Sequence, residues 1–146
     1  MSPFGRVVTS ESELRQLFRP PSAAAVAKEI DHIDDHCREF IARSPFVLVG
    51  TTNTNGTGDV SPKGGPPGFV RVLDSQRLAF GELPGNNRLD CYTNILHTSA
   101  VGLLFLLPGV DECLRVNGTG HVVSDPDTLA ECALDGRLPK IALGVE

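Results

Sequence analysis

One lysine on a predicted strand and one arginine near a predicted helix start have the chemistry and spacing to bind an anion. Ser61 and Lys63 lie two residues apart in the strand-like run GDVSPK, so their side chains project from the same face. Arg88 lies where we expect a helix to begin, and a cation is disfavoured there unless an anion lies beside it. The sequence therefore predicts a phosphate held between Lys63 and the Asn87-Arg88 turn, with Asn86 or Asn87 capping the helix.

Short strands joined by tight turns must position these residues. The β-branched run FVLVGTT is followed by Asn-Gly at 55–56, a strong hairpin signal, and GDVSPK returns as the second strand. The glycine- and proline-rich residues 64–68 can continue neither a helix nor a central strand, so we expect a loop beside the site. The runs FVRVL and RLAFG predict another hairpin, and residues 87–98 predict the helix.

The last third of the chain predicts further strands and a short helix. Residues 100–107 are almost continuously apolar, which predicts a strand buried on both faces. The run ECLRVNGTGHVVS predicts a strand with a kink or bulge at Asn117-Gly118. Asp125 is expected to cap a short helix with Pro126 at its first position, and residues 140–145 begin one more strand.

The N-terminal part of the chain is expected to be helical. Ser10, with a glutamate three residues later, predicts a capped short helix that two prolines end. Ser22 is expected to cap a single longer helix over residues 23–44, whose apolar residues recur at helical spacing. The polar face of that helix carries His32 and His36, an i, i+4 pair that can chelate a metal. With no third ligand nearby, a solvated face is favoured and no metal site is predicted.

These elements predict a mainly β (α+β) fold, a small barrel of about six strands with flanking helices rather than a βαβ sheet. The 146 residues suit one domain overall. Within it, we expect residues 1–45 to form a helical segment packed on the barrel, and residues 46–146 to form the barrel itself.

Composition excludes several classes of protein. The formal net charge of −5 argues against a general nucleic-acid binder. The N-terminus has no signal-peptide pattern, and the longest apolar run, residues 101–107, is far too short to cross a membrane. The four cysteines are widely spaced without a C-x-x-C pair, which indicates reduced thiols. We therefore expect a soluble cytoplasmic protein.

Five segments, taken together, resemble the pyridoxamine 5′-phosphate oxidase-related proteins, the FMN-binding split β-barrel family. They are SPFVLVGTTNTNG, DVSPKGGPPGFVRVLD, LPGNNRLDCYTNIL, VGLLFLLPGV and ECLRVNG, in matching order over roughly residues 30–146. The resemblance implies a flavin-dependent oxidoreductase that is a homodimer with FMN at the subunit interface. In this resemblance, the family's flavin-contacting strand falls on Val60, Ser61, Pro62 and Lys63. Its phosphate-binding turn falls on Asn86, Asn87 and Arg88. One further position, beside the cofactor or the dimer interface, falls on Arg115.

The sequence departs from this family pattern at several points. Leu83 and Asn87 stand where relatives have arginine, and Gly65 stands where they have an acid. Fewer cations imply a weaker hold on a phosphate dianion. Relatives also continue past Glu146 with another strand and a segment rich in His, Cys and Arg, so we expect the C-terminal part to be shortened. Oxidation of pyridoxamine phosphate itself is not expected, because that segment binds the substrate.

Two alternative functions stay open. The first is a non-catalytic flavin-binding or empty dimeric barrel that acts as a carrier or interaction module. The second is a relative with a different cofactor, a deazaflavin or a haem, for which His97 or His121 would be the candidate axial ligand. The sequence identifies no general acid or base, and it leaves open which small-molecule substrate the protein would take.

Overall fold

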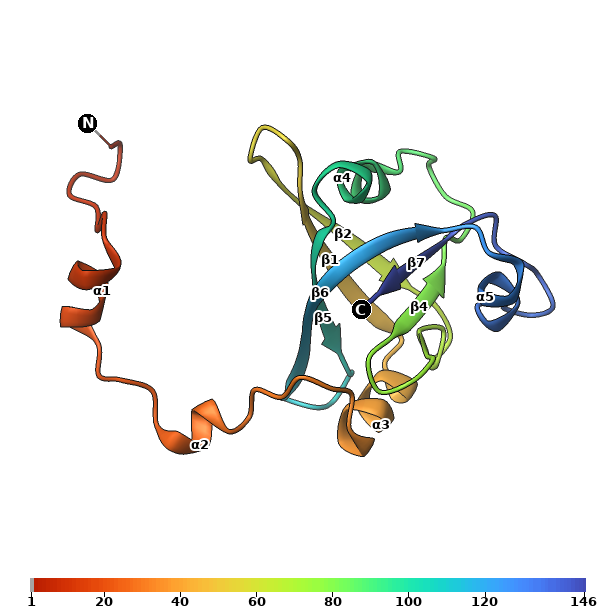
Figure 1. Cartoon of the computed structure of the whole chain (residues 1–146), viewed down its shortest axis with the longest axis horizontal. Coiled ribbons are helices and arrows are strands. Elements are labelled where there is room, and N and C mark those ends of the chain that lie inside the picture. The colour runs from red at the N-terminus through yellow and green to blue at the C-terminus, as the bar shows by residue number, and fades with distance from the viewer. Residues whose placement is uncertain (1) are drawn as a thin grey trace. The chain divides into compact units, whose positions relative to one another are not determined.

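The computed structural model describes residues 2–146, and its internal contacts divide them into two units, residues 2–31 and residues 32–146 (Figure 1). None of the helices in the described part of the chain combines the length and the apolar composition that a membrane span requires.

Serine caps begin both helices of the first unit. Helix α1 (Glu11–Leu17) follows Ser10, whose hydroxyl oxygen accepts a backbone N–H three residues later at 3.1 Å. Helix α2 (Ala23–Val26) follows Ser22, whose hydroxyl accepts in the same way at 3.2 Å. Both caps agree with the sequence prediction, because capping depends on residues within one turn.

The single long helix predicted over residues 23–44 is wrong. The chain forms α2 and, after a break, a separate helix α3 (Asp35–Arg43). Asp34 begins α3, because its carboxylate accepts the backbone N–H of Cys37 at 2.8 Å and so favours a helix start. Just before it, the N–H of Ile33 bonds the carbonyl oxygen of Ser75 at 2.7 Å, a contact within the second unit that a continuous helix would not make.

The second unit is an antiparallel sheet that curls into a split barrel, as predicted. Its seven strands have the order β2-β1-β5-β6-β7-β4-β3. They are β1 (Phe46–Thr52), β2 (Gly58–Gly64), β3 (Arg71–Val72), β4 (Leu78–Gly81), β5 (Ala100–Leu106), β6 (Cys113–Val123) and β7 (Ala142–Val145). Strands β2 and β3 are the two edges, so β2 has one side free of sheet hydrogen bonds.

The long strand β6 joins the two halves of the barrel. It pairs with β5 as far as Thr119 and with β7 from Gly120 onward. The register with β5 runs without interruption through Asn117-Gly118, so the bulge predicted there is absent from β6. The curvature of the sheet comes instead from this exchange of partners along one continuous strand (Figure 1).

Apolar side chains from the inner faces of the strands and from the covering helices fill the barrel. Helix α4 (Asp90–Thr98) packs on β1, β2 and β6, and α3 packs on β3 and β6. The last helix, α5 (Pro126–Glu131), begins after Asp125, the predicted cap. Core residues include Val47, Val49, Leu78, Phe80, Tyr92, Ile95, Leu103, Phe105 and Leu143.

Strand β5 buries only one of its faces, which corrects the prediction of burial on both. Leu103 and Phe105 are buried, but Leu104 is half-buried and Leu106 is exposed. An antiparallel strand in a barrel wall faces the core with alternate residues only. The barrel therefore presents an apolar outer face on this side within residues 32–146.

Candidate functional site

Lys63 projects toward the barrel interior although it carries a charge. Lys63 lies opposite Val47 and Ser61 opposite Val49 in the β1–β2 register, and directly opposite residues share a face. Both valines are fully buried, and the Lys63 side chain is only 19% exposed. The shared face predicted for Ser61 and Lys63 is therefore the face that turns inward.

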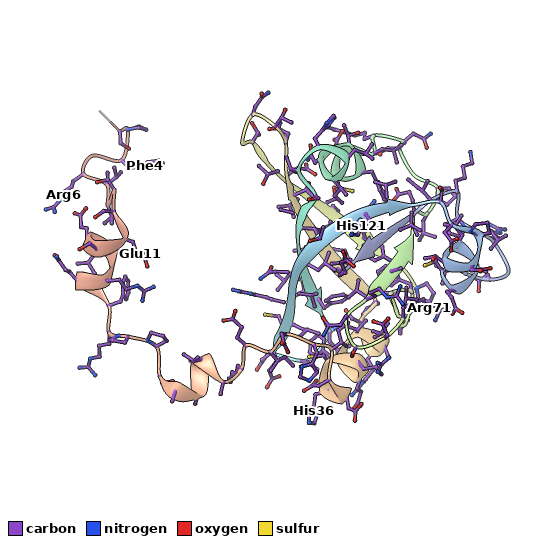
Figure 2. The ribbon with its side chains drawn as sticks, viewed as in Figure 1. Phe4, Arg6, Glu11, His36, Arg71 and His121 are labelled. Atoms are coloured by element: carbon purple, nitrogen blue, oxygen red, sulfur yellow. The ribbon has the colours of Figure 1, made fainter. Side chains whose placement is uncertain are left out.

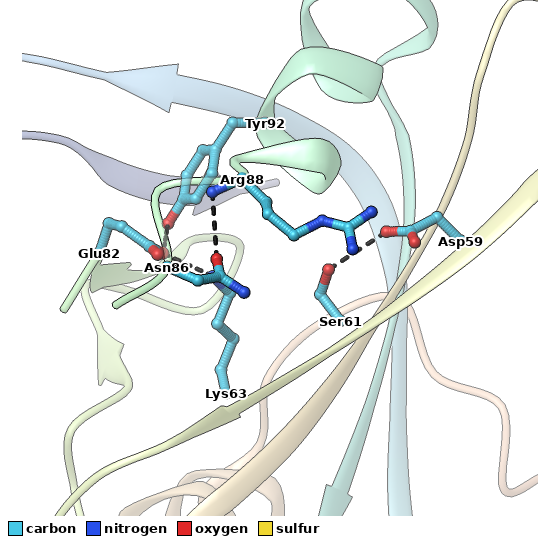
Figure 3. A network of polar contacts seen from close by, with 7 residues as sticks. All are labelled: Asp59, Ser61, Lys63, Glu82, Asn86, Arg88 and Tyr92. Atoms are coloured by element: carbon cyan, nitrogen blue, oxygen red, sulfur yellow. Dashed lines mark hydrogen bonds and ion pairs between the residues drawn. The ribbon is translucent and has the colours of Figure 1, made fainter. Parts of the chain in front are cut away.

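Two residues distant in sequence surround the Lys63 ammonium (Figure 3). Its Nζ lies 2.5 Å from Oε2 of Glu82, just after β4, and 5.1 Å from the ring centroid of Tyr92 in α4. The Tyr92 hydroxyl donates to the same Glu82 oxygen at 2.8 Å. These three residues, called the lysine cluster below, combine an ion pair, a cation–π contact and a hydrogen bond in a partly buried setting.

Two groups at the lysine cluster, the Tyr92 hydroxyl and the neighbouring Cys91 thiol, stay neutral near pH 7. Burial first, and then the hydrogen bond to Glu82, raise the pKa of Tyr92 well above its usual value. Burial also raises the pKa of the Cys91 thiol, although the positive charge of Lys63 acts in the opposite direction. Neither residue is suited to act as a base near neutral pH, and neither adds a negative charge to the cluster.

Helix α4 begins later than predicted and has no side-chain cap. It starts at Asp90 after Leu89, whose φ of 56° is left-handed, and no side chain accepts a hydrogen bond from its first turn. The prediction that Asn86 or Asn87 caps this helix is wrong. Asn86 instead accepts the backbone N–H of Arg88 at 3.1 Å, which closes a local turn ahead of the helix.

The first turn of α4 therefore keeps backbone N–H groups that no side chain caps, whereas each of the other four helices in residues 2–146 has a side-chain cap. Lys63 contacts this turn through a side chain, because its ammonium lies over the ring of Tyr92, the third residue of α4. The preceding turn is left-handed at Asn87 and again at Leu89, with φ values of 58° and 56°. Turns of this kind can direct successive N–H groups to one side, and such arrangements bind anions.

Arg88 extends from this turn with its guanidinium in solvent. Its Nε and Nη2 lie 2.9 and 2.8 Å from Oδ2 of Asp90, and its side chain is 73% exposed. An exposed ion pair of this kind contributes little to stability and is easily rearranged. Arg88 precedes the helix rather than standing in its first turn, yet its guanidinium remains available to a ligand at the turn.

The remaining predicted site residues lie on the outer side of the barrel. Val60 and Pro62 alternate with the inward-facing residues of β2, and Val60 is 64% exposed. Arg115 lies on β6 opposite the outward-facing Leu104. Three strand spacings separate β6 from β2, roughly 14 Å. One chain alone does not bring Arg115 to Lys63.

Sequence reasoning missed Glu82 and the polar role of Tyr92. The sequence pattern assigns Tyr92 to the apolar stripe of its helix, and the residue is indeed only 3% exposed. The available signal was its hydroxyl, because a buried tyrosine O–H needs a hydrogen-bond partner. Glu82 directly follows the buried strand β4, where an acid needs a cation nearby.

A hollow of about 540 Å³ lies away from the lysine cluster in the second unit, between α3, β3 and α5. Its lining includes Arg71, whose Nε donates to the carbonyl oxygen of Glu131 at 3.0 Å near the end of α5 (Figure 2). This arginine satisfies carbonyl groups at a helix C-terminus, a common structural role. His36 lies within α3 while His32 precedes it, and residues 2–146 hold no cluster of three potential metal ligands.

Comparison with known proteins gives one family match and a set of similar folds. The family model described as pyridoxamine 5′-phosphate oxidase matches residues 33–141. No curated protein sequence matches the chain. Among solved structures, a Lactobacillus delbrueckii protein that carries the name of a pyridoxamine 5′-phosphate oxidase is 21% identical, with 81% of this chain and 92% of that chain covered and a TM-score of 0.63.

Two further structures share the fold and differ in what their names say they bind. The FAD binding protein from Mycobacterium smegmatis is 17% identical over 80% of this chain and 91% of that chain, with a TM-score of 0.51. HutZ, the heme storage protein from Vibrio cholerae, is 10% identical over 77% and 87%, with a TM-score of 0.52. At these identities the similarities establish the fold alone.

Proposed function

The chain belongs to the pyridoxamine 5′-phosphate oxidase family, and from this premise we propose that it is a flavin-binding oxidoreductase whose cofactor is FMN. The observation that carries the proposal is the position of Lys63 against the uncapped first turn of α4. A cation and free backbone N–H groups beside one another are suited to a phosphate group.

The donors around this turn fit the phosphate of FMN. Lys63 supplies an ammonium group, the first turn of α4 supplies backbone N–H groups, and Arg88 supplies a guanidinium that only an exposed ion pair holds. Asn86 and Asn87 would add side-chain amides at the edge of the same turn, although Asn86 already accepts one backbone N–H. The donor set is chemically appropriate for a dianion.

The edge strand β2 supports placement of the rest of the cofactor. Its outer edge has no neighbouring strand, so backbone groups beside Val60 and Ser61 are free to bond a ligand. The outward side chains of Val60 and Pro62 offer apolar contact to a planar ring. When bound, the flavin would supply the redox chemistry, and the protein would bind, orient and shield it.

The apolar outer face of the barrel supports a homodimer. In the registers β2-β1-β5-β6 this face brings together half-buried or exposed apolar residues around the opposed glycines Gly50 and Gly102. Exposed apolar faces of this kind commonly mark protein interfaces. A second copy packed here would also give Arg115, which lies on the same face, a route to the partner's cofactor.

We also propose that the protein is cytoplasmic. The four cysteines within residues 2–146 form no disulfide with one another, and thiols persist in the reducing cytoplasm.

The first test is the visible absorption spectrum of the purified protein, with FMN added to any colourless preparation. Bound oxidised flavin supports the site. Stopped-flow mixing with NADH or NADPH then separates an enzyme from a carrier, because a carrier's flavin is reduced no faster than free FMN. A protein that binds no flavin by either route would overturn the proposal.

A second candidate is an empty or carrier barrel, and the ion pair between Lys63 and Glu82 favours it. An internal carboxylate already satisfies the most buried cation of the phosphate site.

Haem is less well supported as the alternative cofactor. His121 lies 3.2 Å from a Glu146 carboxylate oxygen, and His97 is exposed on α4. If the protein reconstituted with haem shows a bound-haem spectrum, and added FMN does not bind, haem is favoured as the cofactor.

A further inference from the structure

Glu82 is paired with Lys63, the more buried of the two cations assigned to the candidate phosphate site. Its Oε2 accepts from both Lys63 and Tyr92, at 2.5 and 2.8 Å, and its side chain is 23% exposed. The side chains of this ion pair are therefore more sheltered from solvent than those of the exposed pairs in residues 2–146.

A carboxylate held in this position changes what the site can bind. It neutralises Lys63, so the strand offers an incoming dianion a dipole instead of a full positive charge. A phosphate that approached the ammonium would also lie near the carboxylate, and like charges in a partly buried site repel strongly. Binding must then displace Glu82 from Lys63 or tolerate that repulsion.

We infer that Glu82 is an internal anion that competes with the cofactor phosphate for Lys63 and so sets how strongly the site prefers a phosphorylated flavin. The inference rests on the proposed function, and it concerns a property of this chain's own residues. It assigns Glu82 a role in specificity, exerted through Lys63. Arg88 and the α4 turn then provide most of the phosphate preference in the natural chain.

The test compares FMN with riboflavin, which lacks the phosphate, in fluorescence-quenching titrations of the wild type and Glu82→Gln. Glutamine keeps an oxygen that can accept from the Tyr92 hydroxyl while removing the charge. We expect Glu82→Gln to raise the ratio of FMN affinity to riboflavin affinity roughly tenfold, as one freed charge-assisted bond allows. Glu39→Gln, which removes one exposed carboxylate paired with Arg43, is the matched control and leaves the ratio unchanged.

The double variant Lys63→Met with Glu82→Gln identifies the mechanism. If the gain comes from a freed Lys63, the double variant loses it. An unchanged ratio in folded Glu82→Gln, with FMN still bound by the wild type, overturns the inference and leaves the proposed function intact. If neither protein binds FMN, the proposed function fails and the inference with it. Should Glu82→Gln fail to fold, as judged by circular dichroism, Glu82→Met is measured in its place with the same expected rise.

Discussion

A lysine on the core-facing side of an edge strand is tolerated here because two neighbours satisfy it. Lys63 pairs with Glu82 and lies over the ring of Tyr92, and the tyrosine hydroxyl completes the carboxylate's bonding. Removing one side chain from a partly buried polar cluster leaves the other side chains without their hydrogen-bond partners. The stability of this corner of the barrel should therefore depend on all three members.

Replacement of Tyr92 by phenylalanine tests that dependence. Tyr92→Phe keeps the ring over Lys63 but removes the donor to Glu82, and we expect the free energy of unfolding to fall by about 1–2 kcal/mol. Urea denaturation provides the measurement. In a Glu82→Gln background the same change should cost less, because the charged acceptor is gone. Equal costs in the two backgrounds would show that the hydroxyl does not act through Glu82.

The cap of α3 predicts a dependence of stability on pH. The backbone N–H of Cys37, foremost among several contacts, holds the pKa of Asp34 below its ordinary value of 3.8. Because the folded pKa is the lower one, the stabilisation is present above about pH 4 and is lost as the pH falls through that lower pKa. Asp34→Asn keeps a capping oxygen without the titration. The difference in melting temperature between wild type and Asp34→Asn should thus shrink from pH 7 to pH 2.5.

A difference that stays constant over this pH range would contradict the account of Asp34. Asp34→Ala is the companion variant, since alanine caps poorly, and it should melt below both proteins at pH 7.

At the residue scale, the sequence predicted what local spacing determines and missed what folding brings together. Ser61 and Lys63 share a face because strand side chains alternate. The partners of Lys63 could not be read in this way, since Glu82 is 19 residues away and belongs to the other half of the barrel. Only the register and the packing of α4 bring them together.

Elements were predictable where a side chain within one turn defines their ends. Ser10, Ser22 and Asp125 cap their helices as expected. The start of α4 was mispredicted because the Asn86 side chain bonds the backbone ahead of the helix instead of capping it. The predicted bulge in β6 failed for a different reason. Asn-Gly often marks a turn, but here it lies in a strand held by two neighbours in succession.

Gly118 in β6 tests how closely this strand passes the last described residue. A Cβ at this position would overlap the backbone carbonyl oxygen of Glu146, which also accepts the N–H of Thr119 at 2.7 Å. Backbone cannot move aside as a flexible side chain can, so Gly118→Ala should destabilise the fold by roughly 1–3 kcal/mol. Gly58→Ala is the control, because nothing lies within 4 Å of its Cβ. Equal thermal denaturation of the two variants would refute the close approach.

At the scale of the whole molecule, the apolar outer face is the feature that most needs a partner. The sequence suggested that β5 is buried on both faces, and in the second unit only one face is buried. The prediction of burial on both faces is wrong for this unit, and the apolar residues of the outer face are available to a partner surface. We expect that surface to be a second copy of the chain.

Leu104 lies near the middle of this outer face, so a charge there should prevent association. We expect the wild type to be a dimer by size-exclusion chromatography with light scattering, and Leu104→Asp to be a folded monomer, since a buried unpaired carboxylate is costly. Leu138→Asp changes an exposed leucine in a loop and should remain dimeric. A dimer that survives Leu104→Asp would place the interface elsewhere.

The measurement that tests the account most directly is a paired titration of FMN and riboflavin against the wild type and Arg88→Ala. If the turn before α4 binds the phosphate, the wild type binds FMN more tightly than riboflavin, and Arg88→Ala weakens FMN binding roughly 3- to 10-fold while riboflavin binding stays the same. Arg43→Ala, which removes an exposed arginine from another ion pair, should change neither affinity. Equal affinities for the two flavins, unaffected by Arg88→Ala, would contradict the phosphate site on which the proposed function rests.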